Sequence, residues 1–403
     1  MSKLLVDGTY AINIVKLKEI AEKKTTKNIY GLVTETFTNS AENGIISQSD
    51  FFDRTITNDK NISGYFIVEP DDFVYNPRIS TFAPVGPINR NKLGRSGVMS
   101  PLYLVFHTHD VEPEYLEWYF KSNAWHQFMR DNGNTGARSD RFSISDAEFF
   151  NMPIPIPPVK VQKAIAKTLT TLDTKVILEK NEVEKFQNLK SAMLTKMFPK
   201  KDGNVPEIRF DGFTDVWEQR KFGEIVDKYE DPVETPHDGY YRLGIRSHAK
   251  GTFHSYVEKG HELETAQMYR VAAGNFIVNI TFGWEHAVAI TNESDAGKLV
   301  SHRFPQYSFH DDMLPEFFKY VIADEDFRHW LWLASPGGAG RNRVLKLDEM
   351  LNYEMVLPSK EEQQRIAAIF RNLDTLITLH QRKYEKLIDT KKAFLEKLIG
   401  GEK

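Results

Sequence analysis

The sequence predicts an α+β protein made of two similar halves, with two long helices that pair as an antiparallel coiled coil. Three observations lead to this prediction. A segment of 41 residues occurs twice in the chain of 403, at a constant offset of 201. Both copies have the apolar spacing of a coiled-coil helix. The residues before each copy form short β-type segments separated by turns.

The repeat sets the expected domain boundaries. Residues 157–197 align without gaps on residues 358–398, and Gln162 matches Gln363 in this alignment. Weaker similarities precede both copies in the same order, which argues against chance likeness between two amphipathic helices. We therefore expect a first globular domain at 1–156, a first long helix at 157–200, a linker and second globular domain at 201–357, and a second long helix at 358–403.

Both repeated segments have apolar residues in alternating steps of four and three, which is the seam of a coiled coil. Both seams turn polar at matching places, Glu179 with His380 and Lys190 with Lys391. The two helices are expected to pair with each other or to bind a partner protein, and two unrelated surface helices are the alternative. The apolar seam residues expected to carry these contacts are Ile165, Leu169, Leu172, Val176, Phe186, Ile366, Phe370, Leu373, Ile377 and Leu387.

Each globular domain is predicted to combine short strands with one amphipathic helix that follows a Pro-Glu pair. Strands are expected at 65–68, 73–75, 102–106, 276–280 and 287–290, where β-branched and aromatic residues gather. The helices are expected over 113–129 and 315–333. This composition indicates compact α+β domains with long irregular loops.

Glycine- and arginine-rich loops occur at matching places near the end of each domain, over 133–141 and 336–343. Glycine allows close backbone approach, while Arg and Asn can donate to phosphates or base edges. An ordinary solvated loop is the alternative, and recurrence in both halves weakens it. With other polar turns included, the candidate nucleic-acid-binding residues are Asn76, Arg78, Lys92, Arg95, Asn134, Arg138, Arg141, Arg246, Asn279, Thr281, Arg341, Asn342 and Arg343.

Composition limits the classes of protein that remain. The chain has no cysteine, which excludes a disulfide scaffold and a thiol nucleophile and suits a reducing, cytoplasmic setting. No apolar run is long enough for a membrane span, and no secretory signal is visible at the start. The net charge is −4, so any surface that binds nucleic acid must concentrate its basic groups locally.

Several catalytic signatures are missing. There is neither a Gly-x-x-x-x-Gly-Lys-[Ser/Thr] phosphate loop nor a strand-anchored Gly-x-Gly-x-x-Gly. The [Asn/Asp]-Pro-Pro-[Tyr/Phe] turn of DNA amino-methyltransferases is also absent. His107, His109 and Asp110 could present metal ligands, but a surface histidine pair is favoured. We therefore expect a chain that binds and organises, with no catalytic residue, metal or cofactor of its own.

Three stretches resemble the specificity subunit of type I restriction–modification enzymes. The first is Pro153–Pro158 continuing to Gln162, and the second runs from Met197-Phe-Pro-Lys200 through Val205-Pro-Glu-Ile-Arg-Phe210 to Lys221. The third begins at Glu362-Gln-Gln-Arg-Ile366 and reaches Asp374. The second stretch is the most specific, and the resemblance covers the whole chain in layout.

This resemblance implies two target recognition domains, each reading half of a split, asymmetric site in double-stranded DNA. It implies a coiled coil that sets the half-site spacing and docks two methyltransferase subunits, while two restriction subunits supply translocation and cleavage. S-adenosylmethionine, ATP and Mg²⁺ would then belong to these partners, and the chain itself would not be an enzyme. The other reading that remains is a non-catalytic scaffold that spaces two protein-binding domains on a coiled-coil rod.

Overall fold

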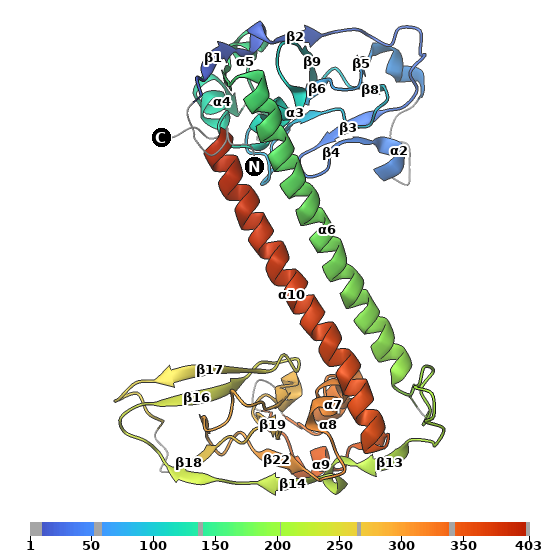
Figure 1. The fold of residues 1–403 in the computed structure, drawn as a ribbon, viewed down its shortest axis with the longest axis vertical. Coiled ribbons are helices and arrows are strands. Elements are labelled where there is room, and N and C mark those ends of the chain that lie inside the picture. Colours follow the sequence, from blue (N-terminus) through green and yellow to red (C-terminus); the bar gives the residue numbers. More distant parts are fainter. Residues whose placement is uncertain are drawn as a thin grey trace. The chain divides into compact units, whose positions relative to one another are not determined.

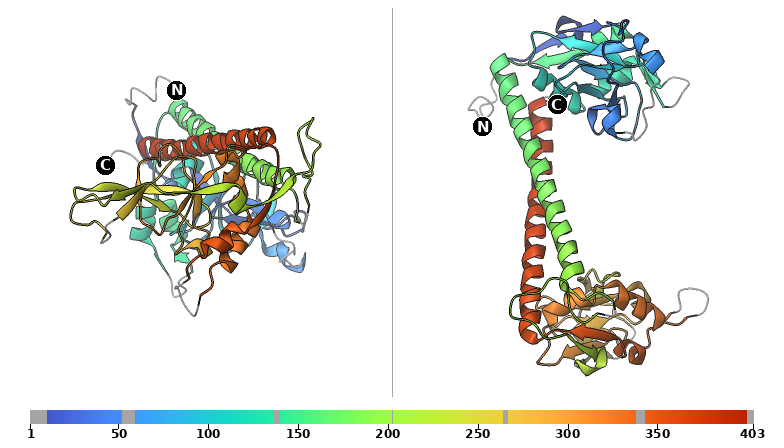
Figure 2. Two further views of the ribbon diagram at one scale, coloured as in Figure 1. Left: turned by 90° about the horizontal axis from the view of Figure 1, so that it is seen from below. Right: turned by 90° about the vertical axis from the view of Figure 1, so that its right-hand side faces the viewer.

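The computed structural model describes residues 10–51, 59–135, 140–201, 203–263, 267–337 and 343–399. The chain divides into two compact units. The first unit combines Met1–Asn181 with Gln381–Lys403, and the second is Glu182–His380. Both units mix helices and strands, as the labels in Figure 1 and the two further views in Figure 2 show. The predicted fold class is confirmed.

Each unit begins with the same small motif. An antiparallel strand pair joins the start of the globular part to the residues just before the long helix, and a 3-10 turn follows. In both turns a glutamate, Glu19 or Glu224, accepts the backbone N–H of the lysine that precedes the turn. The elements are β1 (Asn13–Lys16) with β12 (Pro153–Ile156) and η1 (Leu17–Glu19), and β13 (Glu218–Lys221) with β23 (Glu354–Leu357) and η3 (Phe222–Glu224).

Both units then build a four-stranded antiparallel sheet of the same order. The first is β2-β9-β6-β7 and the second is β14-β22-β19-β20, so corresponding strands occupy corresponding places. Because the order involves non-consecutive strands, chance agreement is implausible, and the sequence repeat extends into the tertiary fold. The bounds are β2 (Ala21–Lys24), β9 (Leu104–Thr108), β6 (Phe73–Tyr75) and β7 (Ile88–Arg90), and β14 (Val226–Tyr229), β22 (Gln306–Phe309), β19 (Phe276–Val278) and β20 (Val288–Ile290).

The single helix expected after each Pro-Glu pair is instead two helices, so that prediction was wrong. In the first unit the break follows Ser122, whose hydroxyl donates to the carbonyl of Tyr119, and buried Trp125 donates to the carbonyl of Phe120. In the second unit Asp324 caps a new helix by accepting the N–H of Asp326. The four helices are α3 (Pro113–Lys121), α4 (His126–Asn132), α7 (Pro315–Val321) and α8 (Glu325–Leu333).

The units differ in the structure that surrounds this shared frame. Among the described residues, the first adds three separate strand pairs and three short helical segments, whereas the second adds a five-stranded sheet of order β15-β18-β21-β16-β17. The additions in the first unit are β3 (Phe37–Ser40), β4 (Gly44–Ser47), α2 (Gln48–Phe51), η2 (Asp59–Gly64), β5 (Phe66–Val68), β8 (Gly97–Met99), β10 (Asn134–Thr135), β11 (Phe142–Ser143) and α5 (Asp146–Phe150). Those in the second are β15 (Pro232–Glu234), β16 (Tyr240–Ile245), β17 (Thr252–Val257), β18 (Gln267–Arg270), η4 (Gly283–Glu285), β21 (Leu299–Val300) and α9 (Leu347–Leu351).

The two repeated segments form the long helices α6 (Val159–Met197) and α10 (Lys360–Ile399). They run antiparallel within each unit, because contacts further along α6 fall on earlier residues of α10. In the first unit Asp173 pairs with Lys391 at 2.8 Å and Glu179 with Lys383, and in the second Phe186 lies beside His380 and Lys190 pairs with Asp374 at 2.6 Å. Every predicted seam residue is buried or half-buried. The polar seam positions also find partners: Glu179 pairs with Lys383, and His380 lies 5.3 Å from the ring of Phe186.

Two buried glutamines attach the globular parts to these helices in the same way. Gln162 accepts the N–H of Glu112 and donates to the carbonyl of Pro157, both at 2.8 Å. Gln363 accepts the N–H of Leu314 at 2.9 Å and donates to the carbonyl of Pro358 at 3.0 Å. Each amide therefore joins the start of a long helix to the start of α3 or α7.

Each hydrophobic core continues from the globular part onto the helix pair. In the first unit Ile165, Leu169 and Ile399 pack with the aromatic residues of α3 and the sheet. In the second unit Ile366 and Phe370 pack with the aromatic residues of α7 and the sheet. Among the described residues no helix is long and apolar enough to cross a membrane.

Candidate nucleic-acid interface

The site is built on two equivalent turns, one at the end of β6 and one at the end of β19. Asn76 accepts the backbone N–H of Arg78 at 3.0 Å, and Asn279 accepts that of Thr281 at 3.0 Å. An asparagine that accepts from the residue two positions on forms a local turn that replaces strand pairing. The two turns thus share this hydrogen bond and carry different side chains.

Each of these turns accepts a backbone hydrogen bond from the segment that follows a glycine-rich loop. Phe142 donates its backbone N–H to Pro77 at 2.7 Å, and Leu345 donates its N–H to Ile280 at 2.9 Å. These two hydrogen bonds put the turns and the loop ends into one register. By that register Thr281 corresponds to Arg78, and Arg343 corresponds to Asp140.

In the first unit this arrangement presents a mixed pair of charges. The Arg78 side chain is 69% exposed, and its guanidinium lies 3.8 Å from the carboxylate of Asp140. Arg141 forms a β-bridge with Arg78, and exposed Asn134 lies in the neighbouring strand β10. Because an ion pair this exposed contributes little to stability, both charged groups are available to a ligand.

The amide of Asn76 is engaged within the protein. Its Nδ2 donates to the carbonyl of Asn39 at 2.9 Å, so both ends of its amide are engaged within the protein. Buried Asn39 in turn donates to Val74 at 2.6 Å and accepts from Asn89 at 2.7 Å. This amide network fixes the β3–β4 hairpin against β6. No local motif points to Asn39 or Asn89, since their partners lie far apart in the chain.

In the second unit the turn collects two guanidinium groups and two indoles. Arg303 donates to the hydroxyl of Thr281 at 3.4 Å. The guanidinium carbon of Arg343 lies 5.9 Å from the ring centroid of Trp284 and 5.1 Å from that of Trp332. Trp284 donates its indole N–H to the carbonyl of Thr281 at 3.2 Å. Arg303 and both tryptophans were not predicted, because no local motif links them to Arg343.

The surroundings of Arg343 are apolar and aromatic. Trp332 is 43% exposed and stacks on His329 at 6.0 Å, and the neighbouring Val344 is 54% exposed. Behind the turn, buried His286 lies 2.6 Å from the carbonyl of Ile322 through Nε2. Burial lowers the pKa of His286, so the neutral ring donates this hydrogen bond and adds no charge to the site.

Three other predicted cations are held by local partners. Lys92 lies 3.2 Å from Glu117, which also pairs with Arg90 and Lys121. Arg95 donates to both oxygens of Glu35, at 2.7 and 2.6 Å, and this contact lowers the pKa of that carboxyl group.

Arg246 donates to the carbonyl of Thr252, and its guanidinium lies 5.3 Å from the ring of Phe253. The described contacts join none of these three cations to the two turns. Arg138, Arg341 and Asn342 lie outside the described residues, so their assignment stays a prediction from sequence.

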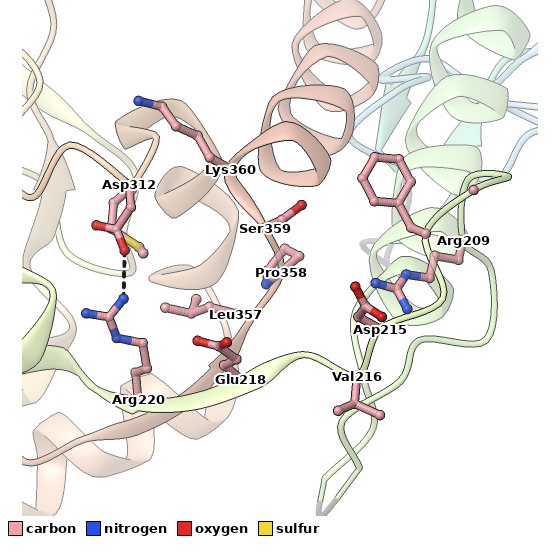
Figure 3. A pocket seen from close by; sticks show the side chains of 13 residues that line it. Arg209, Asp215, Val216, Glu218, Arg220, Asp312, Leu357, Pro358, Ser359 and Lys360 are labelled. Atoms are coloured by element: carbon pink, nitrogen blue, oxygen red, sulfur yellow. Dashed lines mark hydrogen bonds and ion pairs between the residues drawn. The ribbon is translucent and has the colours of Figure 1, made fainter.

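A pocket of about 260 Å³ lies in the second unit, where the linker meets the start of α10 (Figure 3). Its charges are largely compensated. Arg220 pairs with Asp312 at 2.8 Å, and Arg209 donates to both oxygens of buried Glu362 at 2.7 and 2.8 Å. These contacts fasten the linker motif to the helix.

No group of three or more potential metal ligands occurs within the described parts of the chain. His107 lies 2.8 Å from Asp72, and His109 lies 3.0 Å from Asp110. The two histidines are therefore each held by a separate carboxylate.

The amino-acid sequence is similar to those of known proteins. The model of the type I restriction modification DNA specificity domain matches residues 12–187 and 250–388. The type I restriction enzyme MjaVIII specificity subunit of Methanocaldococcus jannaschii is 24% identical over 274 residues, which span 63% of each chain. The putative type I restriction enzyme MjaX specificity subunit of the same organism is 23% identical over 75% of this chain and 71% of the relative.

A crystal structure of the type I restriction–modification system S subunit from M. genitalium has the same fold. Its TM-score is 0.57 at 11% identity, and the match covers 98% of both chains. The family match covers most of the chain and both of its halves. The chain belongs to the type I restriction modification DNA specificity domain family.

Proposed function

We propose that this chain is the specificity subunit of a type I restriction–modification complex and that it reads a two-part, asymmetric site in double-stranded DNA. The observation that carries the proposal is the pair of equivalent turns with different chemistry. The same backbone position presents Arg78 with Asp140 in one unit and Thr281 with Arg343 in the other. Two domains that share a frame but differ in their polar side chains suit recognition of two different half-sites.

Within this proposal the chain reads DNA and its partners perform the chemistry. The partners are two methyltransferase subunits and two restriction subunits, which bind S-adenosylmethionine, ATP and Mg²⁺, and the complex works in the cytoplasm. The description of the matching family, a DNA specificity domain, supports this division of roles.

The long helices offer repeat-related positions for partner docking. Leu178 on α6 and Leu379 on α10 match in the repeat, and they are 57% and 55% exposed. Single exposed leucines are common on protein surfaces, but their recurrence at the repeat offset suits two partners of one kind. Leu178→Asp and Leu379→Asp are each expected to weaken one of two methyltransferase-binding sites. Titration calorimetry would then count one site lost in each variant and both in the double variant.

DNA reading is tested by selection from a pool of randomised 40-base-pair duplexes. The full chain, alone and with its methyltransferase subunit, is incubated with the pool, and the bound duplexes are sequenced. We expect two constant half-sites of different sequence, separated by a spacer of fixed length, with affinity that falls steeply as salt rises. Enrichment of no sequence, or salt-independent binding, would contradict the proposal and favour the scaffold reading.

A further inference from the structure

We propose that Arg343 reads a guanine in the half-site bound by the second unit, and that Trp284 and Trp332 hold its guanidinium in place. The inference rests on the function proposed above and names the chemistry of one contact within it. It concerns the second unit alone, because the corresponding position of the first unit is Asp140.

The guanidinium of Arg343 lies over two indole rings. Both indole rings lie within 6 Å of its central carbon, at 5.9 and 5.1 Å, which is the range of cation–π attraction. Such contacts restrict the side chain while its N–H edges keep their hydrogen-bonding capacity. Within the described part of the chain, Arg343 has neither an ion pair nor a hydrogen bond through its guanidinium.

Other arginines of the same unit show the contrast. Arg209 donates two hydrogen bonds to Glu362, and Arg220 donates to Asp312 and to the carbonyl of Glu224. These side chains stabilise the fold and have little capacity left for a ligand. Arg343 combines restraint with unused donors, which is the state that favours specific recognition over ion pairing within the protein.

Guanine fits this group better than a phosphate does. The major-groove edge of guanine offers two acceptors, O6 and N7, which match the paired N–H groups of one guanidinium. Trp332 and Val344 beside Arg343 are apolar and partly exposed, so a docked base edge would exclude water there. Arg303 at the same turn suits a phosphate instead, because it is exposed and, among the described residues, its guanidinium is held only by the 3.4 Å hydrogen bond to Thr281.

The test uses the full chain with its methyltransferase subunit and the site recovered from the randomised pool. Each guanine of the second half-site is replaced in turn by 7-deazaguanine, which lacks N7, or by inosine, which keeps O6 and N7 and lacks only the minor-groove amino group. We expect one position at which 7-deazaguanine weakens binding while inosine does not. A whole bidentate contact is worth roughly five- to 150-fold, and 7-deazaguanine, which keeps O6 and lacks N7, should lose only part of that factor.

Variants assign that contact to a side chain. Arg343→Ala should lose a similar factor on the native duplex and become indifferent to the base pair at this one position. Arg343→Lys keeps the charge and should retain salt-dependent binding while discriminating less well. Arg303→Ala is the matched control, and it should weaken binding to all duplexes equally. Trp332→Ala should reduce discrimination by loosening Arg343, and Trp332→Phe should restore it.

Several outcomes would overturn the assignment. These are a second half-site without guanine, an Arg343→Ala variant that keeps its base preference, or a loss from Arg343→Ala that is equal for all base pairs, which would indicate a phosphate contact. Each variant is compared with the wild-type chain by its urea denaturation midpoint, so that misfolding is recognised. A wild-type chain that enriches no sequence refutes the proposed function itself, whereas a split site that ignores Arg343 refutes only this inference.

Discussion

Replacing Gln363 by methionine tests how a globular part is fixed to its long helix. The side chain is fully buried, accepts the N–H of Leu314 at 2.9 Å and donates to the carbonyl of Pro358 at 3.0 Å. Methionine has a similar length and flexibility, so it fills most of the volume and removes both hydrogen bonds. The substitution therefore isolates the hydrogen-bonding contribution from the cost of a cavity.

The expected loss follows from the two backbone groups left behind. A buried polar group without a partner costs about 1–3 kcal/mol. The carbonyl of Pro358 is buried and should lie in the upper part of this range, whereas Leu314 is only half-buried, so water can partly replace the lost acceptor. Together they predict a decrease of about 2–4 kcal/mol in the free energy of unfolding of the second unit. Gln364→Met, at the exposed neighbouring position, should change it by less than about 0.5 kcal/mol.

Urea denaturation measures the total change, and amide hydrogen exchange locates it. We expect faster exchange at the N–H of Leu314 and in α7, with β2 and β9 of the first unit unchanged. Gln162→Met should produce the mirror result, with α3 affected and α7 protected as before. A loss below about 1 kcal/mol for Gln363→Met, or equal losses for Gln363→Met and Gln364→Met, would refute the reasoning.

Three further predictions address charge, register and length. Burial of Glu117 opposes its ionisation, but Lys121, Lys92 and Arg90 outweigh this effect and lower its pKa to about 2. The ionised carboxylate therefore stabilises the first unit by at most about 3 kcal/mol above the unfolded-state pKa, and this stabilisation is lost as the pH falls from about 4.5 to 2. Glu117→Gln should abolish this acid dependence when denaturation is measured as a function of pH. Lys391→Met and Asp173→Asn should each cost about 0.5–1 kcal/mol, and a double-mutant cycle should give a coupling that shrinks in 1 M salt; additive losses would show that the ion pair contributes nothing. Inserting one heptad after both Val176 and Leu387 keeps the apolar seam of the two helices. It should lengthen the spacer in the selected DNA by about three base pairs and leave both half-sites unchanged. A changed half-site would show that the helices do more than set the spacing.

The parts of the fold that depend on local periodicity and on repetition could be predicted from the amino-acid sequence. The seams of α6 and α10 could be located residue by residue, because a 3.5-residue apolar period has few structural solutions. Their polar interruptions were also visible in both copies, although the pairing of Lys190 with Asp374 and of Lys391 with Asp173 required the antiparallel register. The single helices expected over 113–129 and 315–333 show where periodicity fails. Apolar spacing continues through Ser122–Trp125, but a buried tryptophan and a capping serine decide the break.

Which polar residues are engaged within the protein depends instead on the tertiary fold. Asn76 has a residue type as suitable as those of Arg78 and Arg343, yet both ends of its amide are engaged by Asn39 and Arg78. Arg303, Trp284 and Trp332 come from separate segments and join Arg343 only through the fold. A donor's availability depends on what lies within about 3 Å of it, and that depends on residues far away in the chain. A helical period depends on residues that are close together in the chain, whereas the interface depends on residues that are far apart. The helices could therefore be predicted from the sequence, and the interface could not.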